Sequence, residues 1–156
     1  MFDLSGKKAL VTGATGGLGS EIARALHKAG ASVALSGTRE AVLNDLASEL
    51  GDRVAVCPAN LSDADSVDAL PKQASEALDG LDILISNAGV TRDQLLMRMK
   101  DEDWETVIKV NLEAHYRLSK AAMRGMMKQR FGRIIGITSI VGVTGNAGQT
   151  NYAASK

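Results

Sequence analysis

The chain has 156 residues, of which 45% are hydrophobic, a size that suits one domain with a buried core and is too small for two. Eighteen Lys and Arg balance eighteen Asp and Glu, so no global field would draw the protein to nucleic acid or to a membrane. The N-terminus lacks the plan of a signal peptide, and no apolar run approaches the ~20 residues of a membrane helix. We therefore expect one cytoplasmic domain over residues 1–156, without nucleic-acid or membrane partners.

Five short apolar runs alternate with longer stretches of helical periodicity. In chain order, the runs are KKALVTG, ASVALSG, RVAVCPAN, LDILISNAG and GRIIGITS. This alternation predicts parallel strands joined by right-handed crossovers. The predicted fold class is therefore α/β, a doubly wound parallel sheet between two helical layers, as in the Rossmann fold.

The first predicted helix follows the first strand directly. Gly30 comes after it and is a residue type that commonly ends a helix. Four apolar residues at helical spacing are expected on its inner face: Leu18, Ile22, Ala25 and Leu26.

The later helices show more varied signals. Ser62 and Asp65 resemble a capping box that opens the third helix, whereas Pro71 predicts a break or kink in it. Residues 101–130 predict one long helix or two nearly continuous ones. The single cysteine, Cys57, lies in an apolar run and is expected to pack in the core rather than react.

The segment TGATGGLG, from Thr12 to Gly19, follows the first strand and opens a helix. A strand-to-helix turn beside a phosphate needs backbone without side chains, and the helix N-terminus offers free N–H groups with a partial positive charge. Gly13, Gly17 and Gly19 suit these needs, although a mere tight turn would also use glycine. The position after the first strand of an alternating chain favours dinucleotide binding.

The segment after the second strand, LSGTRE, favours NADP over NAD. An acidic side chain there would bind the ribose hydroxyls of NAD, but Ser36, Gly37 and Thr38 provide none. Arg39 follows, and its cation matches a 2′-phosphate. Alternatively, Arg39 is a solvated residue in the first turn of the next helix, and Glu40 adds an opposing charge.

The end of the fourth strand carries the third piece of the pattern, SNAG, from Ser86 to Gly89. The carboxyl ends of strands in such sheets face the ligand crevice, where small residues and an amide suit a nucleotide. A plain turn explains the same letters locally. Only the other motifs favour the functional interpretation.

Together, these motifs resemble the short-chain dehydrogenase/reductase family. Within it, the segments TRDQLLMRMKDEDW and RLSKAAMRGMMKQRFGRII are similar to bacterial β-ketoacyl-acyl-carrier-protein reductases of fatty-acid synthesis. The resemblance covers essentially the whole chain. The motifs that carry it are the loop Thr12 to Gly19, NAG at Asn87 to Gly89, Asn111 in KVNLEAH, Ser139 in ITSIVG, and Tyr152 with Lys156 in NYAASK.

The resemblance implies that NADPH is the cofactor. It places the glycine loop at the phosphates, Asn60 and Leu61 at the adenine, and Asn87 at the adjacent ribose. The full set that it implies is Gly13, Ala14, Thr15, Gly16, Gly17, Leu18, Gly19, Thr38, Arg39, Asn60, Leu61, Asn87, Ala88, Gly89, Tyr152 and Lys156.

Two positions depart from the family pattern. Many NADP-binding relatives carry a basic residue where this chain has Gly16, and many have Asn where it has Ser86. The first departure weakens the interpretation that NADP binds and puts more weight on Arg39.

The expected reaction is reduction of a β-ketoacyl thioester, for which the protein must supply an acid. A tyrosine of ordinary pKa, about 10, donates a proton readily only if a cation stabilises its phenolate. Lys156 follows Tyr152 by four residues and so shares its helical face. Ser139 could orient the carbonyl, and the resemblance implies that Asn111 holds a water for proton relay.

Each of these residues also has an ordinary structural explanation. Tyr152 and Lys156 could be an amphipathic pair, Ser139 a strand-end hydroxyl, and Asn111 a helix-kink residue. A reductase for another ketone or alcohol, or a catalytically silent nucleotide-binding fragment, is the alternative function. His27 and His115 lack the spacing of metal ligands, so no metal site is predicted.

Partners are expected at the end of the long helix. A solvated face would explain the positive charges there, but the resemblance implies that Arg130 docks acyl carrier protein near the ligand crevice. It also implies a homotetramer formed through the long helix and the helix that begins at Tyr152. The charged residues are Lys120, Arg124, Lys128, Arg130 and Arg133.

Relatives in this family continue with the rest of the tyrosine helix, two more strands and a substrate-covering segment. We therefore expect the C-terminal strands of the fold to be missing from the 156 residues. The chain is then either part of a longer protein or a true fragment. A fragment would have a marginal tyrosine helix and an unpaired edge at its fifth strand.

Overall fold

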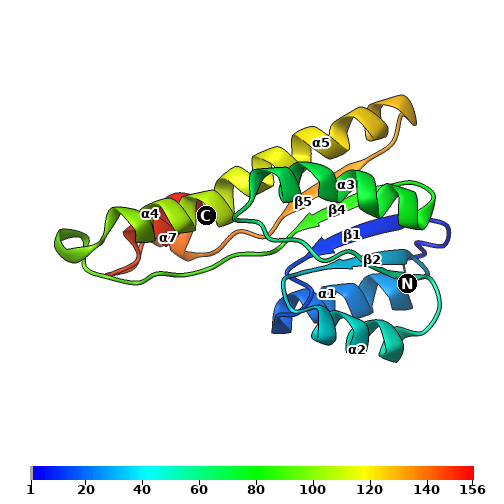
Figure 1. The fold of residues 1–156 in the computed structure, drawn as a ribbon, viewed down its shortest axis with the longest axis horizontal. Coiled ribbons are helices and arrows are strands. Elements are labelled where there is room, and N and C mark those ends of the chain that lie inside the picture. Colours follow the sequence, from blue (N-terminus) through cyan, green and yellow to red (C-terminus); the bar gives the residue numbers. More distant parts are fainter. Residues whose placement is uncertain (1) are drawn as a thin grey trace.

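A computed structural model describes residues 2–156 (Figure 1). Its five strands form one parallel sheet in the order β3-β2-β1-β4-β5. The strands are β1 (Lys8–Thr12), β2 (Ser32–Ser36), β3 (Val54–Val56), β4 (Ile83–Ser86) and β5 (Arg133–Gly136). The helices are α1 (Gly17–Lys28), α2 (Glu40–Leu50), α3 (Ala64–Leu78), α4 (Asp101–Ile108), α5 (Ala114–Lys128), α6 (Val141–Thr144) and α7 (Thr150–Ser155). The 3₁₀ turn η1 (Leu96–Arg98) and the π-helical turn η2 (Lys109–Glu113) complete the set.

Helices cover both faces of the sheet, with α1 and α2 on one side and α3 and α5 on the other (Figure 1). Successive residues of a strand point to opposite faces, so each strand contributes to two cores. In β1, Leu10 packs in the core under α3 and α5, whereas Ala9 and Val11 pack in the core under α1 and α2. The predicted three-layer, doubly wound α/β fold is confirmed.

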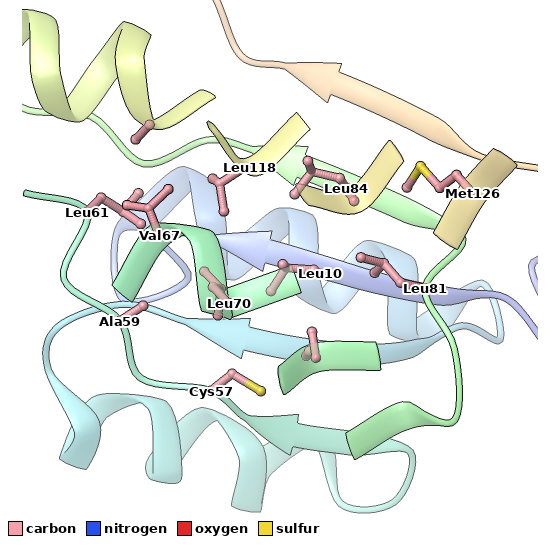
Figure 2. Packing of buried hydrophobic residues seen from close by; sticks show 14 of the residues in the cluster. Leu10, Cys57, Ala59, Leu61, Val67, Leu70, Leu81, Leu84, Leu118 and Met126 are labelled. Atoms are coloured by element: carbon pink, nitrogen blue, oxygen red, sulfur yellow. The ribbon is translucent and has the colours of Figure 1, made fainter. Parts of the chain in front are cut away.

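The core under α3 and α5 is shown in Figure 2. Leu10 and Leu84 from the sheet meet Leu70 of α3 and Leu118 of α5, and all four are fully buried. Burying each leucine contributes about 1.5–3 kcal/mol to folding. Cys57 lies in the same core, and its burial raises the pKa of the thiol. The prediction that Cys57 packs rather than reacts is consistent with this position.

The inner face of α1 differs from the predicted one. Leu18 is 60% exposed and Ala25 is exposed, so both predictions are wrong. Ile22 and Leu26 pack against the core as expected, although they are only partly buried. The fully buried positions are Gly19 and Ala23, because α1 lies close against the strands and leaves room only for small side chains there.

The start of α3 also corrects the sequence analysis. Its N-cap is Asp63, whose side chain accepts a hydrogen bond from the Ser66 amide at 3.1 Å, so Ser62 and Asp65 form no capping box. Pro71 neither breaks the helix nor ends it, because α3 continues to Leu78. Pro71 is itself one of the buried residues of the helix.

The long helix is confirmed as two nearly continuous helices. The helices α4 and α5 are joined by η2, where the Ala114 amide donates to the Lys109 carbonyl in the π-helical pattern. Exposed apolar side chains line one side of this segment, and the tetramer expected through it remains a prediction. They are Leu112, Tyr116, Met123 and Met127.

The strand β5 is shorter than its apolar run suggested. It pairs with β4 alone among the described residues, and Ile134 and Ile135 are both partly exposed. Ser139, expected at the strand end, lies three residues beyond Gly136 in the segment that leads to α6. No helix within residues 2–156 is long and apolar enough to cross a membrane.

Because Gly19 packs closely against the glycine loop, we expect a larger side chain at this position to destabilise the protein. A methyl group there would lie 2.1 Å from the Gly13 carbonyl oxygen, so Gly19→Ala must displace the glycine loop. We expect the free energy of unfolding to fall by about 1–3 kcal/mol, the usual cost of overpacking. Urea unfolding followed by circular dichroism measures it.

The matched control is Gly125→Ala, because a methyl group at Gly125 would meet nothing within 4 Å. Alanine is favoured over glycine inside a helix by about 1 kcal/mol, so this variant should be at least as stable as the unmutated protein. Equal stability of the two alanine variants would contradict the packing described for Gly19.

Candidate active site

The candidate site lies where the strand order changes direction. From β1 the chain crosses to β2 and β3 on one side and later to β4 and β5 on the other. The two crossovers leave the sheet in opposite directions and open a crevice at the adjacent carboxyl ends of β1 and β4. A cleft of about 500 Å³ occupies this place, and we call it the β1–β4 cleft.

The β1–β4 cleft contains nearly all of the predicted cofactor residues. Those that line it are Gly13, Thr15, Gly16, Gly17, Leu18, Gly19, Thr38, Arg39, Asn60, Leu61, Asn87, Ala88 and Gly89. Ala14 is the exception in the loop, because it is 1% exposed and does not line the cleft. Its amide instead donates to the Ser36 carbonyl at 2.9 Å, which ties the loop to β2.

The buried hydroxyl of Thr12 joins the ends of the two central strands. It donates to the Ile85 carbonyl at 3.3 Å and accepts from the amides of Asn87 and Ala88, each at 3.1 Å. Thr12 begins the glycine motif, but the motif by itself predicts no role for the threonine side chain. The available signal was a hydroxyl at the last position of a buried strand, directly before Gly13.

Asn87 supports the glycine loop from the other side. Its Nδ2 donates to the Thr12 carbonyl at 3.0 Å and to the Gly13 carbonyl at 3.4 Å. Gly13 has a φ of 66°, and a methyl group on it would lie 2.8 Å from the Cα of Ala88. Only glycine fits there, because of both the left-handed backbone and the close approach of the loop after β4.

The N-terminus of α1 opens into the β1–β4 cleft without a competing partner. Its N-cap, Gly16, has an extended backbone and no side chain to cap the first amides, and the first turn contains no acid. The first N–H groups of a helix and its dipole attract anions. This end of the cleft can therefore hold a phosphate group of a nucleotide.

Arg39 lines the β1–β4 cleft. It is the N-cap residue of α2, and its Nη2 donates to the Thr15 carbonyl at 2.5 Å. The side chain is thus turned back toward the glycine loop. Ser36, Gly37 and Thr38 place no carboxylate beside it, although Glu40 begins α2.

The predicted Tyr152–Lys156 pair is brought together by α7. The Lys156 Nζ lies 5.9 Å from the centre of the Tyr152 ring and donates to the Ile137 carbonyl at 2.8 Å. Lys156 is half-buried, and this burial lowers the pKa of its ammonium. The cation is therefore held in a fixed place near the tyrosine, just beyond β5.

Asn111 lies in η2, where its side chain is fully used as a donor. Its Nδ2 donates to the Val90 carbonyl at 3.0 Å and to the Ser155 hydroxyl at 2.9 Å, while its Oδ1 accepts from the Val90 amide at 2.8 Å. The side chain thus joins the segment after β4 to the end of α7. Both donor hydrogens are engaged, so a water held here would donate to an oxygen of Asn111, and the relay role that the resemblance implied stays a prediction.

Gly89 is the point where the β1–β4 cleft meets the Tyr152–Lys156 pair. A methyl group on Gly89 would lie 3.3 Å from Asn111 Oδ1 and 3.4 Å from Lys156 Nζ. Gly89 also lines the cleft. A nucleotide that reached Gly89 would therefore arrive beside the Lys156 ammonium, which in turn lies 5.9 Å from the centre of the Tyr152 ring. A phenol with a cation nearby is the arrangement that proton transfer needs.

Ser139 lies on the same side of the sheet end but is bonded locally. Its Oγ accepts a hydrogen bond from the Val141 amide at 3.2 Å. Ser139 lies two residues after Ile137, whose carbonyl accepts the hydrogen bond from Lys156. The helix α6 approaches the end of α7 closely. A methyl group on Gly142 would lie 2.6 Å from the Lys156 carbonyl carbon, so only glycine fits there. Gly142 of α6 and the α7 residues Asn151 and Ser155 contribute to this packing and to the bonds of α7, and no sequence pattern singled them out.

Comparison with known proteins agrees with this geometry. The family model for short chain dehydrogenases matches residues 7–156. Nodulation protein G of Rhizobium sp. (strain N33) is 60% identical over 100% of this chain and 64% of that protein. The 3-oxoacyl-acyl-carrier-protein reductase FabG of Rickettsia bellii (strain RML369-C) is 49% identical over 100% of this chain and 63% of that protein.

A crystal structure shows the same fold. A protein of Sinorhizobium meliloti 1021, described as a short-chain alcohol dehydrogenase, superposes with a TM-score of 0.94 at 34% sequence identity. The match covers 99% of this chain and 63% of that one. The chain thus spans less than two thirds of the length of each of these three relatives.

The matched range includes every part of the candidate site. The glycine loop after β1, the segment after β4 and the Tyr152–Lys156 pair all lie within residues 7–156. The chain belongs to the short chain dehydrogenase family.

Proposed function

We propose that the protein containing this chain reduces β-ketoacyl thioesters carried on acyl carrier protein to β-hydroxyacyl thioesters, with NADPH as the cofactor. The observation that carries the proposal is the meeting of the β1–β4 cleft and the Tyr152–Lys156 pair at Gly89. The relatives named 3-oxoacyl-acyl-carrier-protein reductase, at 49% and 48% identity, support this substrate class.

The residues present fit a nicotinamide dinucleotide, the cofactor type of this family. The glycine loop and the N-terminus of α1 would hold the phosphates, Asn60 and Leu61 would contact the adenine, and Asn87 would border the ribose. Arg39 would face the 2′-phosphate that distinguishes NADP from NAD. When bound, NADPH supplies the hydride that reduces the carbonyl carbon.

The side chains of this protein would then supply the proton. Tyr152 donates its phenolic proton to the carbonyl oxygen, and the Lys156 ammonium stabilises the phenolate that remains. The hydrogen bond to the Ile137 carbonyl keeps Lys156 beside the ring during this step. The Ser139 hydroxyl, at the end of the same segment, would bond the carbonyl oxygen and orient it toward the phenol.

A different ketone is the second candidate for the substrate. The observation that favours it is the relative at 60% identity, which carries the name nodulation protein G rather than that of a fatty-acid enzyme. The same acid and the same cofactor would serve either substrate. A panel of β-ketoacyl thioesters and simple ketones separates the two.

Arg130 is our candidate contact for acyl carrier protein. It lies at the turn between α5 and β5, has a φ of 56°, and is exposed. Lys128 and Arg133 flank it, and both are exposed. A positive patch of this kind suits an acidic protein. The patch precedes β5, so it lies at the amino end of the parallel sheet and not beside the β1–β4 cleft at the carboxyl ends, where the sequence analysis expected it.

The cofactor preference depends on Arg39. We expect the unmutated protein to bind NADPH more tightly than NADH, and Arg39→Asp to narrow or invert this preference, because a carboxylate repels the 2′-phosphate and accepts from ribose hydroxyls. Fluorescence titration with both cofactors measures it. Glu40→Gln is the control and should keep the NADPH preference. Equal affinities in the unmutated protein would end this interpretation.

The role of Tyr152 is tested by removing one oxygen. Tyr152→Phe should lower kcat for β-ketoacyl thioester reduction by about 10²–10⁴-fold, the usual contribution of general acid catalysis. NADPH binding should survive, because the ring remains. The matched control is Tyr116→Phe, which alters the other tyrosine, an exposed residue of α5. Substantial turnover in Tyr152→Phe would show that another group is the acid.

Docking of the carrier protein is tested by charge reversal. Arg130→Glu should raise KM for a carrier-bound substrate on the order of tenfold and leave KM for a small thioester analogue unchanged. Lys28→Glu reverses a charge at the end of α1, on the other face of the sheet, and should affect neither. An equal rise for both substrates would place Arg130 outside the carrier contact.

A further inference from the structure

The helix α7, which carries Tyr152, begins without a side-chain cap. Its N-cap, Gln149, makes no side-chain capping bond. The first amides of a helix need partners from outside the helix, so its start depends on neighbouring groups. The bonds that α7 makes to its neighbours therefore contribute to the position of Tyr152.

Two polar residues occupy the buried face of α7. Asn151 is 0% exposed and Ser155 is 5% exposed, and they are four residues apart. Asn151 directly precedes Tyr152, and Ser155 directly precedes Lys156. Tyr152 and Lys156 are both half-buried. The helix thus presents its proton-transfer groups on one face and a pair of buried anchoring side chains on the adjacent face.

Asn151 binds three different main-chain groups. Its Nδ2 donates to the Arg92 carbonyl at 2.9 Å and to the Asp103 carbonyl at 3.4 Å, and its Oδ1 accepts from the Tyr152 amide at 2.8 Å. Both donor hydrogens and the oxygen are therefore engaged. An amide suits this place because it combines two donors with an acceptor, whereas a carboxylate would face two carbonyl oxygens.

The groups that Asn151 binds belong to segments that build the site. Arg92 lies three residues after Gly89, in the segment that borders the β1–β4 cleft, and Asp103 lies in the first turn of α4. At the other end of α7, Ser155 accepts from Asn111, which also bonds Val90. Both ends of α7 are thereby tied to residues 90–92.

We propose that Asn151 is a positioning residue that holds Tyr152 at the productive place beside the β1–β4 cleft. The inference rests on the proposed function, because it takes Tyr152 as the acid. Asn151 touches neither substrate nor cofactor in this proposal and acts only through the placement of α7. Misplacing a catalytic group by about 1 Å can cost 10²-fold in rate.

The first test measures kinetics in the protein as the cell produces it. Asn151→Ala should lower kcat about 10- to 100-fold while the Kd for NADPH, measured by fluorescence, stays within twofold, where twofold is about the scatter of such titrations. Asn146→Ala is the matched control, because Asn146 is an exposed residue of the preceding turn that bonds only Gln149. It should retain the unmutated kcat.

A double variant separates positioning from general stability. If Asn151 acts through the phenol, Asn151→Ala should cause no further loss of turnover when it is added to Tyr152→Phe. The same fractional loss in both backgrounds would overturn the proposal. Where Asn151→Ala folds poorly, Asn151→Ser, which keeps one hydroxyl, is compared in the same cycle.

Hydrogen exchange provides a readout that needs no substrate. We expect Asn151→Ala to speed amide exchange in the peptide 149–156 and to leave the peptides of β1 and β4 unchanged. Unchanged exchange in 149–156, or equal acceleration throughout the sheet, would overturn the proposal. If the unmutated protein reduces no β-ketoacyl thioester, the proposed function fails, and this exchange pattern still decides whether Asn151 holds α7.

Discussion

The junction between the carboxyl ends of β1 and β4 is the constraint on which the site depends. The buried Thr12 hydroxyl bonds three main-chain groups of the β4 side, and Asn87 returns two bonds to the β1 side. Buried polar groups are costly unless they are paired, and these pair with one another across the junction. The glycine loop and the segment after β4 therefore form one rigid wall.

The second half of the site is attached to this wall through main-chain groups. Asn111 bonds both polar atoms of Val90, and Asn151 bonds the carbonyl of Arg92. Lys156 and Tyr152 are thus held in place by bonds to the same segment that continues from Asn87. The proposed proton transfer and nucleotide binding would depend on the same stretch of backbone, residues 87–92.

Patterns of short range predicted much of this architecture. The alternation of apolar runs indicated five parallel strands, and the spacing of glycines after β1 located the cleft. Predictions failed where a residue's environment came from distant segments. Leu18 is exposed because Gly19 and Ala23 face the sheet, and the partners of Asn151 lie 59 and 48 residues away along the chain. No local spacing encodes such contacts.

The long separation between the segments of the site has a consequence for how the protein acquires it. The bonds across the β1–β4 junction close loops of 73 to 76 residues, and those of Asn151 close loops of 59 and 48 residues. Loop-closure entropy grows slowly with loop length, so neither set of contacts has a strong entropic advantage over the other. Both sets are non-local, and we expect the cleft and the place of Tyr152 to be completed together, late in folding.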